Sequence, residues 1–145
     1  QIGYLSATAN LLGITTPKIA CIAPSEQVLP NVISSTEGAL LAKMGDRGQL
    51  GNVIIDGPLS LDVALYKEVA EHKKVKGSSV AGDPDCLLFP NLESANVFFK
   101  CASHLCGGEL AAMVMGTKVP CVLTSRGDTS LTKLYSIALA CLAAK

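Results

Sequence analysis

Aromatic side chains are scarce in this sequence. It contains no tryptophan, and phenylalanine and tyrosine bring the aromatic share to only 4%. Hydrophobic residues still make up 49% of the 145 residues, and charged residues only 17%. Aliphatic side chains and alanine must therefore fill the core, as is typical of α/β proteins. The length suits a single domain.

An excess of charge of either sign is also missing. The 12 basic and 12 acidic residues cancel, and no run of lysine or arginine occurs, which argues against a nucleic-acid partner. No apolar run reaches the roughly 18 to 20 residues that a membrane span requires, so no membrane partner is expected. The start, Gln1-Ile-Gly-Tyr4, lacks an initiator methionine and a signal-peptide pattern, and we expect that it is not the natural N-terminus.

Familiar nucleotide, hydrolase and zinc motifs do not occur. The chain has no G-x-G-x-x-G, no G-x-x-x-x-G-K-[ST] and no G-x-S-x-G, so simple dehydrogenase, P-loop kinase and serine-hydrolase interpretations lose their main support. None of the six cysteines forms a C-x-x-C pair, and no metal site is expected. Their mostly apolar surroundings favour free thiols in a reducing cytosol. Cys106 is not expected to be a nucleophile.

Strand-like and helix-like segments alternate along the chain. Apolar runs predict five strands, at residues 18–23, 52–55, 85–89, 110–115 and 119–123. Helical spacing of apolar residues predicts helices at 4–12, 34–44, 61–72, 91–105 and from 131 towards 145. Runs that are apolar throughout indicate parallel strands buried on both faces. We therefore predict an α/β fold with a mostly parallel sheet flanked by helices.

Some helix ends carry capping signals. Ser34 and Glu37 fit a capping box, and Asn91 is a candidate N-cap for the helix that Gly107-Gly108 ends. Either Asp128 or Ser130 is expected to cap the last helix through a side-chain oxygen.

The stretch from residue 119 to 130 predicts a buried strand, a polar turn and a helix. N–H groups at a helix start attract anions, and Thr124, Ser125 and Arg126 stand beside them. The turn is a candidate phosphate cradle. The alternative is an ordinary strand–helix loop in which the arginine is solvated. Taken by itself, this stretch favours the alternative.

Other polar residues have open interpretations. Ligands bind at the carboxyl ends of parallel strands, which places Asp56-Gly57-Pro58 near such a site. Asp56 could there act as a general base or orient a substrate hydroxyl or amide, or it could instead cap the next helix or fix the turn. Asn96 and Lys100 share one helix face and either hold an anion or are solvated. His104 continues that stripe and is more simply a surface histidine. Asp62 is expected to be a charge favoured at a helix start.

Several stretches, in this order and spacing, resemble the phosphate acyltransferase family, the phosphate acetyl- and butyryltransferases. They are Lys43-Met-Gly-Asp-Arg-Gly-Gln49, Asp56-Gly-Pro-Leu-Ser-Leu-Asp62, Val80-Ala-Gly-Asp-Pro-Asp85, Phe89-Pro-Asn-Leu-Glu-Ser-Ala-Asn-Val-Phe-Phe-Lys100, Val119-Pro-Cys-Val-Leu-Thr-Ser-Arg126 and Lys133-Leu-Tyr-Ser-Ile-Ala-Leu139. The residues in these stretches are closer to the butyryl branch. The resemblance implies that residues 1–145 are the C-terminal half of such an enzyme, a single α/β unit without the N-terminal half. It also implies a two-domain fold akin to isocitrate and isopropylmalate dehydrogenases.

The resemblance implies the reaction acyl-CoA + phosphate ⇌ acyl phosphate + CoA, with a short acyl group such as butyryl. Coenzyme A and phosphate are then substrates, and no metal or permanently bound cofactor is required. A cytoplasmic homo-oligomer, a dimer or larger, is expected.

Ser125 and Arg126 match the family's Ser-Arg pair at the active-site cleft. The acetyl branch has an acid where this chain has Thr132 and an arginine near the helix end that carries His104, so both departures argue against a plain acetyltransferase. They leave the base unassigned, and Asp128 is the nearest carboxylate. The expected catalytic residues are Ser125, Arg126 and Asp128, and the expected substrate-binding residues are Asp56, Gly57, Pro58, Asn96, Lys100 and Thr124.

Two other functions stay open. A non-catalytic domain that binds an anion or mediates assembly would carry the same turn without turnover. A metal- and nicotinamide-dependent dehydrogenase on the related fold would need a cluster of acidic ligands, which the sequence does not show.

Overall fold

The computed structural model describes residues 1–144. The chain divides into two compact units, Gln1–Ser94 and Ala95–Lys145, and each is described by itself. None of the helices within residues 1–144 has the length and apolar character to span a membrane.

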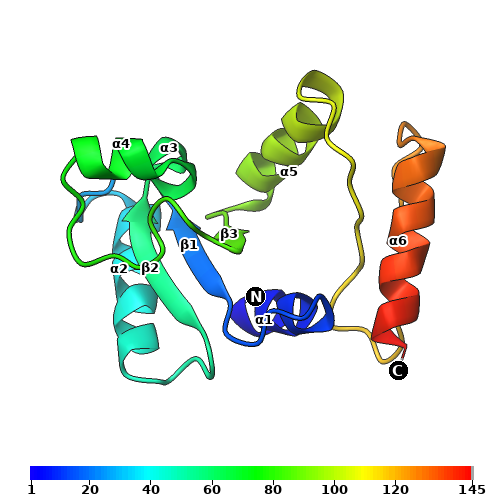
Figure 1. The fold of residues 1–145 in the computed structure, drawn as a ribbon, viewed down its shortest axis with the longest axis horizontal. Helices are drawn as coiled ribbons and strands as arrows, with labels where there is room; N and C mark the ends of the chain where they lie inside the picture. The colour runs from blue at the N-terminus through cyan, green and yellow to red at the C-terminus, as the bar shows by residue number, and fades with distance from the viewer. Residues whose placement is uncertain (145) are drawn as a thin grey trace. The chain divides into compact units, whose positions relative to one another are not determined.

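The first unit follows the predicted alternation of helices and strands. Its elements are α1 (Ile2–Leu11), β1 (Lys18–Ile22), α2 (Ile33–Asp46), β2 (Ile54–Leu59), α3 (Leu61–Leu65), α4 (Lys67–His72) and β3 (Cys86–Leu88). The strands form one parallel sheet in the order β2-β1-β3 (Figure 1). The predicted α/β class with a parallel sheet is confirmed here, with three strands in the sheet.

The central strand β1 is buried on both faces, as its apolar sequence predicts. Side chains alternate along a strand, so Ile19 and Cys21 pack into one cluster and Ala20 into another. The first cluster includes Ile2 of α1 and is covered by Leu41 of α2. The second is built from α3 and α4. Helices thus cover both faces of the sheet, which makes it the core that positions everything else in this unit.

Helix α2 packs closely on β2, and its start differs from the expectation. The capping box at Ser34 is wrong, because α2 begins at Ile33 with no side-chain cap. The buried residues of α2 are Ser35 and Gly38, whereas Leu40 is exposed. A side chain at Gly38 would lie 3.2 Å from the Pro58 Cα, so only a very small residue fits. The Ser35 hydroxyl instead accepts from Leu29 N–H and donates to the Gln27 carbonyl, each at 2.8 Å.

Strand β2 runs further than predicted. The sequence suggested that it stops at Asp56, but the strand continues through Gly57 and Pro58 to Leu59. Pairing with β1 carries it on, since the Leu59 carbonyl accepts from Ala23 N–H at 2.8 Å. Tertiary pairing therefore overrides the breaker residues.

The helix predicted over residues 61–72 is two helices, α3 and α4, separated at Tyr66. Tyr66 has an extended backbone, with φ −122° and ψ 116°. The Ala64 carbonyl, which a continuous helix would use internally, accepts from Gly82 N–H at 3.0 Å. Packing of both short helices onto the Ala20 face replaces the continuous helix.

The second unit contains helices and irregular chain. Helix α5 (Leu92–Lys100) begins just before it and continues into a π-helical turn, Cys101–Leu105, and α6 (Ser130–Ala143) follows later. The strands predicted at 110–115 and 119–123 are wrong. Within residues 95–144 they form only one antiparallel bridge, Val114 to Cys121. Apolar runs become sheet strands only where neighbouring strands offer backbone partners, and the part of this unit that the structure describes offers them only this bridge.

The ends of these helices partly match expectation. Asn91 caps α5, because its Oδ1 accepts from Ser94 N–H at 2.8 Å, and Gly107 ends the π-helical turn with φ +66°. The cap of α6 is Thr129, whose hydroxyl accepts from Thr132 N–H at 3.1 Å, so Asp128 and Ser130 are wrong as caps. The buried face of α6 carries Thr132 and Ser136, not the apolar stripe of Leu131 and its neighbours. The last predicted residue, Lys145, lies outside the described residues.

We predict that Gly57→Ala destabilises the fold. An added Cβ would lie 2.5 Å from the Cys21 Cβ and 3.1 Å from its carbonyl oxygen, so the β1–β2 pair must shift, at a cost of about 1–3 kcal/mol. Urea denaturation measures the loss. The matched variant Gly3→Ala meets no atom within 4 Å and sits in helix α1, so it should gain up to about 1 kcal/mol. Equal stability of Gly57→Ala and wild type would contradict the close approach.

Candidate functional site

The polar turn before α6 is closed by hydrogen bonds between Ser125 and Asp128. The Asp128 Oδ2 accepts from Ser125 N–H at 2.8 Å, and Asp128 N–H donates to the Ser125 carbonyl at 3.1 Å. The Thr129 cap follows directly and begins the helix. The predicted sequence of polar turn and helix is therefore present, although no strand precedes it.

The carboxylate of Asp128 is almost completely buried. Its side chain is 7% exposed, and its Oδ1 lies 3.6 Å from the Nζ of Lys100, whose side chain is 37% exposed. Lys100 is the last residue of α5. The sequence left open whether Asn96 and Lys100 hold an anion or are solvated. Lys100 is not simply solvated, because it is paired with the carboxylate of Asp128.

Arg126 lies exposed at the tip of this turn. Its guanidinium forms no ion pair with a carboxylate of residues 1–144, and the Ser125 hydroxyl likewise has no hydrogen-bond partner there. Thr124 is half-buried just before them, and Asn96 is exposed one helical turn before Lys100 on α5. The structure thus brings Ser125, Arg126, Asp128 and Lys100 together, with two of them still free to bind.

A pocket of about 330 Å³ adjoins the turn. Its lining comes from the π-helical turn, the glycines after it and the start of α6: Ser103, His104, Gly107, Gly108, Glu109, Leu110, Gly127, Asp128, Thr129, Leu131 and Thr132. His104 and Thr132, which the resemblance set against the acetyl branch, both line this pocket. Sequence reasoning missed the contribution of Glu109 and Thr129. The glycine pair before Glu109, interpreted only as a helix end, was the available signal.

A second, polar pocket lies at the carboxyl end of β2 in the first unit. It measures about 380 Å³ and is lined by Glu26, Gln27, Val28, Asp56, Gly57, Pro58, Leu59, Lys73, Lys74, Val75 and Lys76. The Asp56 Oδ1 accepts from the neighbouring Gly57 N–H within β2 at 2.8 Å, and α3 has no side-chain cap, so Asp56 does not cap it. The pocket lies at the carboxyl end of a parallel strand, where the sequence placed a candidate ligand site; its use by a ligand stays a prediction.

Asp62 lies in the first turn of α3, as expected. Its Oδ2 lies 3.0 Å from the Nζ of Lys73. Hydrogen bonds from Ser60 and Lys73 lower the pKa of Asp62 to about 2, which holds this carboxylate ionised. Its role is therefore to anchor Lys73 at the edge of the polar pocket.

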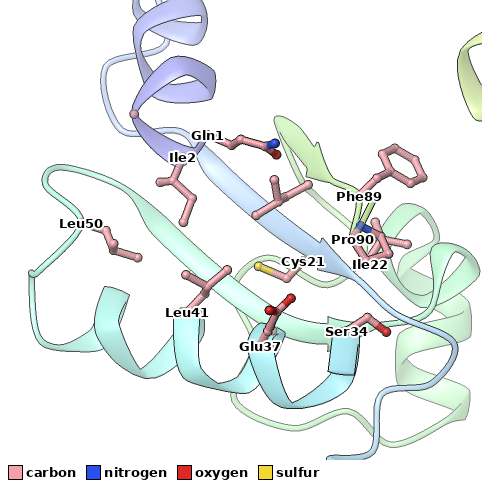
Figure 2. A pocket seen from close by; sticks show the side chains of 13 residues that line it. Gln1, Ile2, Cys21, Ile22, Ser34, Glu37, Leu41, Leu50, Phe89 and Pro90 are labelled. Carbon is pink, nitrogen blue, oxygen red and sulfur yellow. The ribbon is translucent and has the colours of Figure 1, made fainter. Parts of the chain in front are cut away.

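A third pocket, mostly apolar, lies at the carboxyl ends of β1 and β3. It measures about 430 Å³, and no motif of the sequence pointed to it. Figure 2 shows Ser34, Glu37 and Leu41 of α2 along it, with Cys21 of β1 and the Phe89-Pro90 segment that follows β3. All six cysteines are free. Within residues 1–144, no three His, Cys, Asp or Glu side chains gather in a way that could hold a metal ion.

Known proteins are similar in sequence to this chain over nearly its whole length. The family described as Phosphate acetyl/butaryl transferase matches residues 3–141. The chain belongs to this family. Phosphate butyryltransferase of Clostridium beijerinckii is 47% identical over 144 residues, which are 99% of this chain and 47% of that protein. Phosphate acetyltransferase of Thermotoga maritima is 43% identical over 139 residues, 96% of this chain and 47% of that protein.

Solved structures agree with the family assignment. A branched-chain phosphotransacylase from Enterococcus faecalis V583 matches with a TM-score of 0.87 and 30% identity, covering 97% of this chain and 50% of that one. This chain thus spans about half the length of the relatives it matches. The resemblance seen in the sequence is confirmed, whereas kinship with isocitrate dehydrogenase stays a prediction.

We predict that Cys21 resists alkylation in the folded state. Burial, and to a smaller extent the charge of Asp56, raises the pKa of its thiol to about 12 from the ordinary 9.0. At pH 8 only about one thiol in 10⁴ is then ionised, and the thiolate is the reactive form. Iodoacetamide followed by mass spectrometry should label the exposed Cys106 and leave Cys21 unlabelled until urea is added. Rapid labelling of Cys21 without urea would contradict its burial.

The raised pKa of Cys21 also makes the stability of the fold depend on pH. Above pH 9 the unfolded chain loses the Cys21 proton that the folded chain keeps up to about pH 12. This contribution to stability is therefore present below pH 9 and is lost as the pH rises through that window.

Proposed function

We propose that this chain forms the C-terminal half of a phosphate acyltransferase that converts acyl-CoA and phosphate into acyl phosphate and CoA. A phosphate oxygen attacks the thioester carbonyl carbon, a carbon–oxygen bond forms and the carbon–sulfur bond breaks. The proton lost by phosphate ends on the departing thiolate. The family match supports this reaction class, and the turn of Ser125 and Arg126 is the observation that carries it.

Arg126 suits the phosphate-binding role because its guanidinium is exposed and has no carboxylate partner within residues 1–144. A guanidinium can bind two phosphate oxygens with parallel charge-assisted hydrogen bonds. It would hold phosphate close to the thioester, and positioning of that kind supplies much of the rate in such reactions.

Ser125 suits the role of hydrogen-bond donor. Its hydroxyl is exposed beside Arg126, while its backbone is held by Asp128. The hydroxyl would donate to the thioester oxygen or the departing sulfur as negative charge develops there. Because the backbone is held beforehand, little reorganisation is needed during the reaction.

Proton removal from phosphate needs a base, and Asp128 was the candidate in the sequence. Both of its oxygens already have partners, Ser125 N–H and the Lys100 ammonium. That geometry weakens the assignment, since a base needs an oxygen free to receive the proton.

Further substrate contacts are proposed for five of the six residues expected from the sequence: Asp56, Gly57, Pro58, Asn96 and Thr124. The sixth, Lys100, is paired with Asp128. Asp56, Gly57 and Pro58 line the polar pocket at the end of β2. Asn96 and Thr124 lie close in sequence to Lys100 and Ser125, and their side chains form no hydrogen bond within residues 1–144 that would prevent binding.

A short acyl group such as butyryl is proposed, because His104 and Thr132 replace the charged residues of the acetyl branch and line one pocket. The six free cysteines suit a cytoplasmic location. A homo-oligomer, with no bound metal or cofactor, rests on the resemblance alone. So does the two-domain fold akin to isocitrate dehydrogenase.

We predict that Arg126→Ala in the full-length enzyme costs about 2 kcal/mol or more of transition-state binding, through the lost charge-assisted hydrogen bonds. The measurement is phosphate-dependent thiol release from butyryl-CoA, with kcat and KM determined against phosphate. The loss should appear mainly in KM for phosphate.

Lys118→Ala, which removes an exposed cation of the same unit, is the matched control and should stay within about twofold of wild type. Unchanged phosphate dependence in Arg126→Ala would refute the arginine's role. Binding of acyl-CoA without any turnover by the wild-type full-length protein would instead favour a non-catalytic anion-binding or assembly domain.

A further inference from the structure

We propose that Asp128, paired with Lys100, is a positioning residue that holds the Ser125–Arg126 turn in place, and that it is not the general base. What the turn does in catalysis rests on the proposed function. How the turn is held rests on contacts within the second unit alone.

The backbone of Ser125 is held at both of its polar groups by one residue. Its N–H donates to Asp128 Oδ2 at 2.8 Å, and its carbonyl accepts from Asp128 N–H at 3.1 Å. These two bonds close a small ring whose tip is Arg126 and Gly127. With both ends of the ring held, the Arg126 backbone has a defined direction, although its side chain is exposed.

Packing does not hold the tip of the turn. A Cβ built on Gly127 would meet no atom within 4 Å, and Arg126 and Gly127 are both exposed. Without neighbouring side chains, the hydrogen bonds of Asp128 are the constraint that keeps this segment in one conformation. Removing them should release the turn without disturbing a packed core.

Lys100 completes the arrangement. A carboxylate that is only 7% exposed needs a compensating charge, because burying an unpaired charge is costly. The Lys100 Nζ lies 3.6 Å from Asp128 Oδ1, and Lys100 ends α5. The ion pair therefore connects the turn to α5 and leaves Oδ2 for Ser125. In this role Lys100 acts on the turn, not on the substrate.

A general base is the competing role for Asp128, since its carboxylate also lines the pocket beside the turn. A base must accept a proton on a carboxylate oxygen. A positioning residue needs only an oxygen that accepts the Ser125 N–H. An asparagine keeps the second property and loses the first, so the two roles can be separated by one substitution.

The experiment compares Asp128→Asn with Asp128→Ala in the full-length enzyme. For a positioning residue, Asp128→Asn should lose less than about tenfold in kcat/KM for phosphate and keep the acid side of the pH–rate profile. Asp128→Ala should lose on the order of 100-fold, mainly through KM for phosphate, because the released turn misplaces Arg126. A loss of about 10²–10⁴-fold in kcat for both variants, with the acid side of the profile gone, would identify a base and overturn the proposal.

Lys100→Met tests the ion pair by a double-mutant cycle. It should lower kcat/KM about fivefold or more in wild type and less than twofold when Asp128 is already asparagine. Lys133→Met, which removes an exposed lysine of α6, is the matched control and should have the same small effect in both backgrounds. Equal effects of Lys100→Met in the two backgrounds would show that Lys100 does not act through Asp128.

A second measurement does not depend on activity. Amide hydrogen exchange, resolved by mass spectrometry with electron-transfer fragmentation, should show Ser125 N–H protected in wild type and Asp128→Asn, and at least tenfold faster in Asp128→Ala. The Thr132 amide, held by Thr129, is the internal control and should not change. If the wild-type protein released no thiol with phosphate, the proposed function would fail while this measurement still decided the positioning role. Fast exchange of Ser125 N–H in the wild type would overturn it.

Discussion

The buried carboxylate of Asp128 links the elements of the second unit that carry the candidate site. One oxygen holds the Ser125 N–H and the other faces the Lys100 ammonium, so the turn is connected both to the start of α6 and to the end of α5. A carboxylate in that position is stable only while both partners are present. The consequence is an exposed Ser125 hydroxyl and Arg126 guanidinium on a held backbone, which is the arrangement a phosphate-binding turn requires.

The first unit relies on a different constraint, the burial of β1 on both faces. Ile19 and Cys21 face α1 and α2, and Ala20 faces α3 and α4. Because all three strands are parallel, their carboxyl ends lie along one edge of the sheet. The apolar pocket beside Cys21 and the polar pocket beside Asp56 both open along that edge. Small residues make the layers fit, most clearly Gly38 against Pro58 and Gly57 against Cys21.

Local signals predicted best where the deciding atoms are neighbours in sequence. The β1 strand, the parallel class, the Asn91 cap and the end at Gly107 follow from side chains and backbone within a few residues. Predictions failed where a distant partner decided the outcome. Helix 61–72 divides because Gly82 takes the Ala64 carbonyl. The capping box expected at Ser34 does not form, and the buried Ser35 beside it binds the Gln27 and Leu29 backbone. The runs at 110–115 and 119–123 looked like strands, but an apolar run does not supply its own pairing partner.

For the candidate site the same division applies. The sequence by itself determined the family, the α/β class of the first unit and the identity of the exposed Ser125-Arg126 pair, because residue type and order are enough for these. Only the tertiary structure decided that Asp128 binds the turn and not the helix end, that Thr129 is the cap, and that Lys100 faces Asp128. The physical reason is that burial and charge pairing are properties of three-dimensional neighbours: Lys100 and Asp128 are 28 positions apart in the chain, and no local pattern brings their charges together.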